Sequence, residues 1–155
     1  MSVFNLFEST VRTKSGKKQD LEEVLFQQQY HTIYLMLGIN ELGYDYSSII
    51  RKYQSVVDTI KTRQPNAVIV LGANLHVTAQ KSSSSSTYTN EKINQINSGI
   101  RAIAENSDCC YIDVNSIFDD ENGALKTSYS TDGSHVLGKY YSVWTDWLKG
   151  ESPDA

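Results

Sequence analysis

The sequence predicts an α/β fold with a mostly parallel sheet and helices on both of its faces. Short apolar runs at residues 32–37, 67–71 and 109–114 are typical of strands, and segments with helical spacing of apolar residues separate them. Strands that alternate with helices of this length form βαβ units, in which successive strands lie parallel. The length of 155 residues is that of one domain, so we expect a single domain over residues 1–155.

The first part of the chain predicts one short strand and one short helix. Residues 3–7 form a short apolar run, and residues 13–18 form a polar loop. Asp20 and Glu23 have the spacing of an N-cap residue and its N3 partner, so a helix is expected to begin there. The apolar positions that follow lie on one helical face: Leu21, Val24 and Leu25.

The middle of the chain predicts two buried strands with a long helix between them. Residues 32–37 form a nearly continuous apolar run that ends at Gly38, which predicts a strand buried on both faces. Pro65 ends the helix. Its apolar positions share one face: Tyr46, Ile49, Ile50, Tyr53, Val56, Val57 and Ile60. Residues 67–71 form the second strand.

The last part of the chain continues the alternation. Residues 72–89 are polar, and the serine run at 82–86 predicts a mobile surface loop, which we expect to line one wall of a site. A helix begins at Asn90, a third strand covers residues 109–114, and residues 119–123 predict a turn. The last helix carries a stripe typical of core packing: Leu137, Tyr140, Tyr141, Trp144, Trp147 and Leu148.

Composition excludes several classes of protein. A hydrophobic fraction of 39% with 21% charged residues is that of a globular chain, not a disordered one. The net charge of −4 gives no attraction for nucleic acid, and no stretch approaches the roughly 18 apolar residues that span a membrane. Cys109 and Cys110 are adjacent, which favours strand packing over a disulfide framework or a zinc site. We expect no metal and no cofactor.

Polar residues that follow the strands are candidates for a site, because ligands of open α/β sheets bind at the carboxyl ends of the strands. Asn40 follows the first clear strand after Gly38, and its neutral amide could stabilise an oxyanion or merely turn the chain. Asn74 and His76 follow the second strand. For these two residues we expect a structural role or a place at the rim of a pocket.

Asp132 and His135 form the most suggestive pair. Gly133 between them relaxes the turn, so that the carboxylate can hold one imidazole nitrogen and leave the other free to act as a base. The same spacing also suits a plain helix start, with Asp132 as the N-cap residue and His135 in the first turn.

Together these blocks resemble the SGNH hydrolases, also called the GDSL lipase/esterase family. Residues 38–41, Gly-Ile-Asn-Glu, are similar to the family's G-x-N-D block, and residues 131–135, Thr-Asp-Gly-Ser-His, to its D-x-x-H block. The resemblance covers residues 13–148. It implies a three-layer flavodoxin-like fold and ester hydrolysis, with His135 as general base, Asp132 as its orienting partner and Asn40 as an oxyanion donor.

The same resemblance places the backbone N–H of Gly16 as a second oxyanion donor. Glu41 stands where the family usually has Asp, a supporting group. No Gly-Asp-Ser block precedes Gly38 in this chain, so the nucleophile is not identified. Neither Ser2, Ser9 nor Ser15 follows a glycine–aspartate pair, and Ser134 is too close to His135 along the backbone.

Without that block, the first strand of the family's sheet is missing, and we expect an N-terminally truncated chain. Residues 3–7 would then be the family's second strand, would move inward, or would exchange with a neighbouring copy in an oligomer. The expected function is hydrolysis of small acyl or acetyl esters, with a carbohydrate as one option for the alcohol part. As this chain stands, that activity would be absent or impaired.

Two alternatives remain open at this stage, a non-catalytic α/β binding module and a fragment of a longer hydrolase. The implied partner is a small-molecule ester. The first residues lack the basic and apolar regions of a signal peptide, but a start further upstream would leave both cytoplasmic and secreted locations open.

Overall fold

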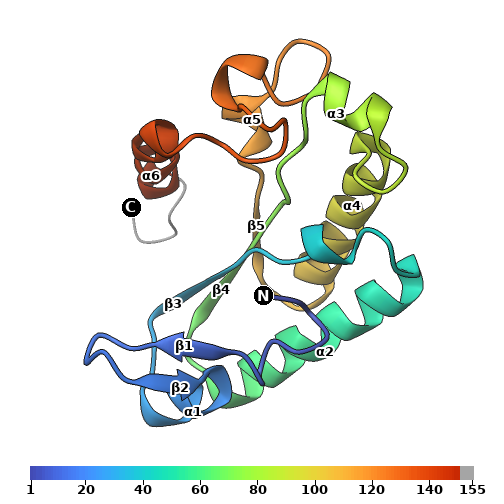
Figure 1. Cartoon of the computed structure of the whole chain (residues 1–155). Coiled ribbons are helices and arrows are strands. Elements are labelled where there is room, and N and C mark those ends of the chain that lie inside the picture. The colour runs from blue at the N-terminus through green and yellow to red at the C-terminus, as the bar shows by residue number, and fades with distance from the viewer. Residues whose placement is uncertain (151–155) are drawn as a thin grey trace.

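The computed structural model describes residues 1–150, and their centre is a parallel sheet of three strands (Figure 1). The strands are β3 (Thr32–Leu35), β4 (Val68–Gly72) and β5 (Cys110–Ile112), in the spatial order β3-β4-β5. Thr32 lies opposite Val68, and Val70 lies opposite Cys110. The alternating strands and helices of the sequence therefore form the parallel α/β arrangement that was predicted.

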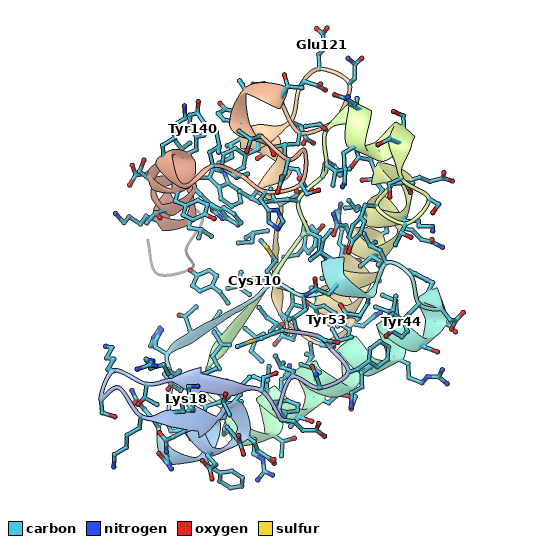
Figure 2. The ribbon with its side chains drawn as sticks, in the orientation of Figure 1. Lys18, Tyr44, Tyr53, Cys110, Glu121 and Tyr140 are labelled. Carbon is cyan, nitrogen blue, oxygen red and sulfur yellow. The ribbon has the colours of Figure 1, made fainter. Side chains whose placement is uncertain are left out.

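One face of the sheet is well covered. Helices α2 (Tyr46–Arg63) and α4 (Asn90–Asn106) lie against it, and they bury the isoleucines and valines that the helical spacing predicted. Tyr53 has no exposed surface and lies between α2 and the sheet, whereas Tyr44 lies at the surface (Figure 2). Most of the hydrophobic core is on this side.

The opposite face has a smaller core. Its buried residues are Val114, Phe118, Leu125 and Val136, which come from the residue before α5 (Asn115–Phe118), from α5 itself and from the loops after it. Trp144 and Trp147 of α6 (Tyr141–Gly150) pack against this cluster, but α6 has no fully buried residue and Tyr141 is exposed. The aromatic stripe is thus only partly core, because only one face of α6 packs against the cluster.

Strand β3 departs from the prediction of a strand buried on both faces. Ile33 and Leu35 pack toward the main core, but Tyr34 and Met36 are 46% and 39% exposed. The cause is position: β3 lies at the edge of the sheet, and within residues 1–150 no strand pairs with its outer side. An apolar groove lined by Tyr34, Met36 and Trp144, among others, runs between this face and α6.

The N-terminal residues differ from the prediction as well. Residues 3–7 form turns instead of a strand, although Val3 and Leu6 are buried in the main core. The polar segment after them is the turn of an antiparallel hairpin, β1 (Thr10–Arg12) and β2 (Lys18–Asp20). The burial of these two side chains and the hydrogen bond from the Val3 amide to Glu41 Oε1 hold residues 3–7 in place, with no strand partner among residues 1–150.

Two helices complete the fold. Helix α1 (Leu21–Gln27) begins after Asp20 as predicted, although the Asp20 side chain makes no capping hydrogen bond. Helix α3 (Ala79–Ser84) occupies part of the stretch predicted to be a loop, and the Thr78 side chain caps it by accepting from the Lys81 amide. No helix among residues 1–150 has both the length and the apolar character needed to cross a membrane.

Candidate active site

A cleft of about 420 Å³ opens at the carboxyl ends of the strands. Asn40, Asn74, Asp132 and His135 all line it, so three loops that are far apart in sequence meet there. Lys81 also lines the cleft, and with Asn74 it comes from the stretch of residues 72–89 that was expected to form one wall. Ligand sites of open parallel sheets lie at this edge.

The Asp132–His135 pair is formed within a single turn. Asp132 Oδ2 lies 2.6 Å from His135 Nδ1, and Asp132 Oδ1 accepts hydrogen bonds from the amides of Ser134 and His135, both at 2.8 Å. The bonds from the Ser134 amide and from the side chain and amide of His135 hold the pKa of Asp132 well below its usual value. Asp132 is therefore a carboxylate that fixes the imidazole ring.

Gly133 lets this turn approach helix α3. Its φ of +80° is in the left-handed region, and a Cβ atom there would lie 2.8 Å from Thr78 Oγ1. The Thr78 amide donates to the Gly133 carbonyl at 2.8 Å. The loop that carries the pair is thus bonded to the loop that follows β4.

The second nitrogen of His135 faces outward. The His135 side chain is 84% exposed, and within residues 1–150 no serine hydroxyl is hydrogen-bonded to it. A neutral imidazole whose Nδ1–H is held by a carboxylate keeps Nε2 as an acceptor, which is the form of a general base. The geometry therefore suits a base with an orienting carboxylate, and within residues 1–150 no serine hydroxyl is bonded to the ring.

Asn40 stands on the opposite wall, in the short 3-10 helix η1 (Ile39–Glu41). Gly38 before it has a φ of +121°, and a Cβ atom there would lie 2.9 Å from Asn74 Nδ2, so only glycine fits this turn. Asn40 Nδ2 donates to the carbonyl oxygen of Met1 at 3.0 Å. The amide thus already binds a carbonyl oxygen, the group that an ester presents.

Asn74 lines the cleft and is also part of the structure beneath it. Its side chain donates to the Leu37 carbonyl at 2.8 Å, and its backbone exchanges hydrogen bonds with the side chain of Asn97. These bonds tie the loops after β3 and β4 together. Asn74 therefore lies at the cleft and also holds together the loops that form it.

His76 does not line the cleft, so its expected place at the rim is wrong. It is buried, with Nδ1 2.7 Å from Asp119 Oδ2 and Nε2 2.7 Å from Asn94 Oδ1. Burial by itself lowers the pKa of His76, but the hydrogen bonds to Asp119 and Asn94 outweigh it and raise the pKa above its usual value. Both nitrogens are engaged, which leaves the structural role.

Gly16 is not brought to the cleft either. It lies in the turn of the β1–β2 hairpin, where its amide donates to the Thr13 carbonyl at 2.8 Å. An amide in that bond cannot serve as an oxyanion donor, so the assignment from the resemblance is wrong. The φ of Gly16, +80°, serves the hairpin turn, so a glycine at this position does not by itself indicate an oxyanion donor.

Glu41 stands where the resemblance places a supporting acid, and its contact is with the N-terminal residues. It is buried beside Asn40, and its Oε1 accepts from the Val3 amide at 3.2 Å, which fixes the N-terminal residues next to the cleft. Its Oε2 has no partner among residues 1–150. Within the same residues, no group of three or more His, Cys, Asp or Glu side chains could hold a metal ion.

The family model described as the GDSL-like Lipase/Acylhydrolase family matches residues 7–141. The chain belongs to this family. None of the curated proteins compared with this family member matches its sequence. Solved structures do match in fold, and three of them are described below.

A protein described as a platelet activating factor from Streptococcus pneumonia is 24% identical, with a TM-score of 0.69 over 78% of this chain and 59% of its own. A protein described as a GDSL-like lipase from Parabacteroides merdae is 16% identical, with a TM-score of 0.71 over 96% of this chain and 67% of its own. At such identities the likeness shows the fold.

A third similar structure is an acetyl-xylooligosaccharide esterase from Geobacillus Stearmophilus, 15% identical, with a TM-score of 0.63 over 84% of this chain and 62% of its own. The GDSL-family chain spans 59%, 60% and 60% of the length of the first three solved structures that it matches.

Proposed function

We propose that the cleft is the general-base and oxyanion part of a site that hydrolyses small acyl esters. The observation that carries this proposal is the convergence of His135, Asp132 and Asn40 on one cleft from two separate loops. Membership of an acylhydrolase family supports it. The 155 residues alone are proposed to be impaired, because no serine hydroxyl within residues 1–150 is bonded to His135.

In this chain the attacking group is water. As its oxygen forms a bond to the acyl carbon, the water proton passes to His135 Nε2, and Asp132 stabilises the imidazolium that results. Asn40 Nδ2 donates to the carbonyl oxygen as it becomes an oxyanion, in place of the Met1 carbonyl that it now holds. When the bond to the alcohol breaks, the imidazolium returns the proton to the alkoxide, which yields a carboxylic acid and an alcohol.

The cleft suits a short acyl group. Met36, Ile39 and Val77 form apolar parts of its wall, and its volume of about 420 Å³ lies at the low end of the range of ligand pockets. Acetyl esters are accordingly the first substrates to try. Similarity to an acetyl-xylooligosaccharide esterase, although limited to the fold, agrees with this choice.

The test is hydrolysis of p-nitrophenyl acetate by the full chain, by His135→Ala and by His31→Ala. His31 is an exposed histidine just before β3 and is the matched control, because any exposed imidazole gives some background reaction. We expect slow turnover in the wild type and in His31→Ala, and a loss of about tenfold or more in His135→Ala. A serine-directed fluorophosphonate probe is expected not to label the chain.

Equal turnover in all three proteins would refute the role of His135 and would leave a non-catalytic binding module as the better explanation. Labelling by the fluorophosphonate probe, abolished in His135→Ala, would show that a serine of this chain does reach the base. The proposed impairment would then be wrong.

A further inference from the structure

The β1–β2 hairpin carries a cluster of positive charge. Arg12, Lys14, Lys17 and Lys18 are all exposed, and they are four of the 14 Lys and Arg residues of the chain. No Asp or Glu occurs among residues 9–19. The net charge of the chain is −4, so this basic cluster departs locally from the charge of the whole molecule.

The charges of the basic cluster are not neutralised by the protein. Within residues 1–150, none of the four side chains makes an ion pair, a hydrogen bond or a contact with an aromatic ring, and Asp20 on the same hairpin pairs with none of them. Most basic side chains elsewhere do have such a partner. Arg101 pairs with Glu105, for example, and Lys92 donates to the carbonyl of Ser86. The basic cluster therefore stands out as unpaired charge.

Two members of the cluster face each other across the hairpin. Arg12 of β1 lies directly opposite Lys18 of β2 in the strand register. Residues that are opposite in an antiparallel pair point to the same face, and like charges in this position destabilise the pair. An anion bound between the two side chains would remove that repulsion. The hairpin thus keeps an arrangement that is unfavourable in the free protein and favourable with a bound anion.

A cavity of about 620 Å³ lies between the hairpin and the end of α1. Arg12 and Lys14 are the only charged residues that line it. Gln27 and Gln28, at the end of α1, also line it, and within residues 1–150 neither side-chain amide donates a hydrogen bond. The cavity therefore offers two positive charges and neutral N–H donors, which together suit an anionic group such as phosphate.

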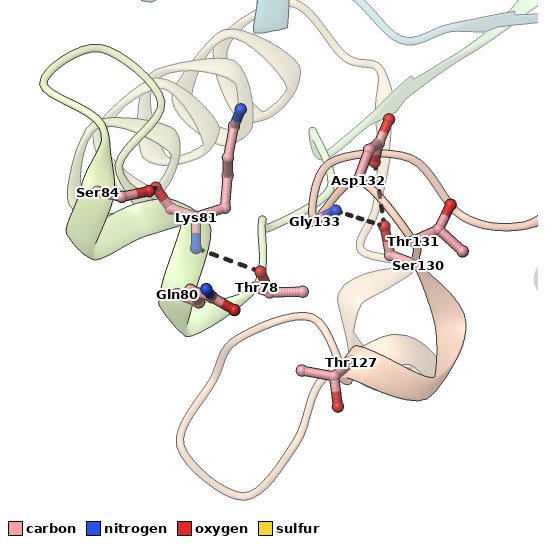
Figure 3. A pocket seen from close by; sticks show the side chains of 9 residues that line it. All are labelled: Thr78, Gln80, Lys81, Ser84, Thr127, Ser130, Thr131, Asp132 and Gly133. Atoms are coloured by element: carbon pink, nitrogen blue, oxygen red, sulfur yellow. Dashed lines mark hydrogen bonds between the residues drawn. The ribbon is translucent and has the colours of Figure 1, made fainter.

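The polar pocket beside the cleft has a different balance of charge. It has a volume of about 350 Å³ and is bounded by α3 and by residues 127–133 (Figure 3). Its lining contains one cation, Lys81, and one anion, Asp132, and both also line the cleft. That pocket belongs to the candidate active site and has no net attraction for an anion, whereas the hairpin cavity has a net positive lining.

The surroundings of the basic cluster indicate which anion fits. Tyr30, the one aromatic residue that lines the cavity, packs against the main core and so presents no free ring face on which a nucleic-acid base could stack. Residues 13–17 contain no apolar side chain that could enter a lipid bilayer. A flexible chain of phosphate groups needs neither feature. Its repeated charges match the four cations, which follow one another along the hairpin.

We propose that the hairpin binds a linear polyphosphate chain, with one phosphate in the cavity at Arg12 and Lys14 and its neighbours at Lys17 and Lys18. Arginine binds a phosphate through two N–H groups, and lysine binds it as a point charge. The hairpin lies beside the start of β3, whereas the cleft opens at the carboxyl ends of the strands (Figure 1). The bound chain would therefore hold the protein without covering the cleft.

The test is a calorimetric titration of the full chain with long-chain inorganic polyphosphate. The variant Lys14→Gln/Lys17→Gln removes two charges from the cluster, and Lys126→Gln/Lys139→Gln, which removes two exposed charges outside the hairpin, is the matched control. We expect the hairpin variant to bind about tenfold more weakly or worse at low salt, and the control to bind as the wild type does. The slope of log Kd against log salt should be about 3 in the wild type and about 1.5 in the hairpin variant.

Three results would overturn the proposal. They are no binding of polyphosphate by the wild type, equal affinity in the two double variants, and tighter binding of another polyanion. For the last, the probes are oligo(dT) with the same number of phosphates and phosphatidylglycerol vesicles, which would identify a nucleic acid or a membrane as the partner. None of these titrations needs ester cleavage, so their outcome is independent of the turnover test on His135.

Discussion

The molecule contains two histidine–aspartate pairs of nearly the same geometry, His135–Asp132 and His76–Asp119. In each, a carboxylate oxygen lies close to Nδ1 of the ring, at 2.6 Å in the first pair and 2.7 Å in the second. Their surroundings differ. The His135 side chain is 84% exposed at the cleft, while that of His76 is 9% exposed.

The difference lies in the second nitrogen of each ring. His76 Nε2 lies against Asn94 Oδ1, so both nitrogens face acceptors and the charged imidazolium is favoured. Such a ring cannot take a proton from a substrate. His135 has only one nitrogen engaged, which leaves the other for chemistry. A carboxylate beside a histidine is thus compatible with either role, and the partner of the far nitrogen decides which.

The largest expected effect of breaking one pair concerns stability. His76→Ala should lower the free energy of unfolding by about 2–4 kcal/mol, because it leaves the largely buried carboxylate of Asp119 without its partner. His135→Ala should change it by less than about 0.5 kcal/mol, as is usual for an exposed side chain. Urea unfolding followed by circular dichroism measures both. If the two variants lost equal stability, the assignment of a structural role to one pair alone would be wrong.

The next effect concerns activity, for which the His135–Asp132 pair should matter more than the His76–Asp119 pair. Asp132→Asn keeps an oxygen for the amides of Ser134 and His135 but no longer holds the ring in the required tautomer, so p-nitrophenyl acetate turnover should fall about tenfold or more. Asp119→Asn should leave turnover within about twofold of the wild type, since it does not touch the cleft. A similar loss in both variants would contradict the division of roles.

A smaller effect is expected from the glycines beside the two pairs. Gly133 and Gly123 have φ values of +80° and +75°, but only at Gly133 would a Cβ atom meet a neighbour, Thr78 Oγ1 at 2.8 Å. Alanine at either position should cost about 1–2 kcal/mol for the left-handed backbone. Gly133→Ala should cost about 1 kcal/mol more, as measured by urea unfolding, because the contact with Thr78 must also give way. Equal costs would show that the turn adapts freely.

The smallest effect is a pH dependence. The folded-state pKa of His76 is raised, so its pair contributes stability below the unfolded-state value of about 6.5, and that contribution is lost as the pH rises through the folded-state pKa. The difference in unfolding free energy between wild type and His76→Ala should therefore narrow from pH 6 to pH 9. A gap that widened with pH would mean that His76 is neutral in the fold.

The sequence predicted the parts of the fold that depend on local pattern. The strands, the long helices and the turn that holds Asp132 and His135 are each set by residues close in the chain. The choice between the two roles expected of His76 was not predictable in this way, because Asp119 is 43 positions away and Asn94 is 18. The misplaced donor at Gly16 has the same origin, since a glycine suits a hairpin as well as a site.

The exposure of β3 was hidden for a related reason. An apolar run predicts a strand buried on both faces only when other elements cover both faces, and the sequence pattern carries no information about how well each face is covered. Tyr34 and Met36 therefore look like core residues in the sequence and lie at the surface in the structure.

The open side of β3 has a consequence for handling the protein. Residues 32–37 contain no charge, no proline and no glycine, and they are rich in β-branched, aromatic and large aliphatic side chains. A segment of this kind at the edge of a sheet is a template for cross-β aggregation. Solubility should then be limited by this edge and not by the strength of the core. The substitution Tyr34→Lys places a charge on this edge, as natural edge strands often do. It should raise the concentration at which the protein stays in solution.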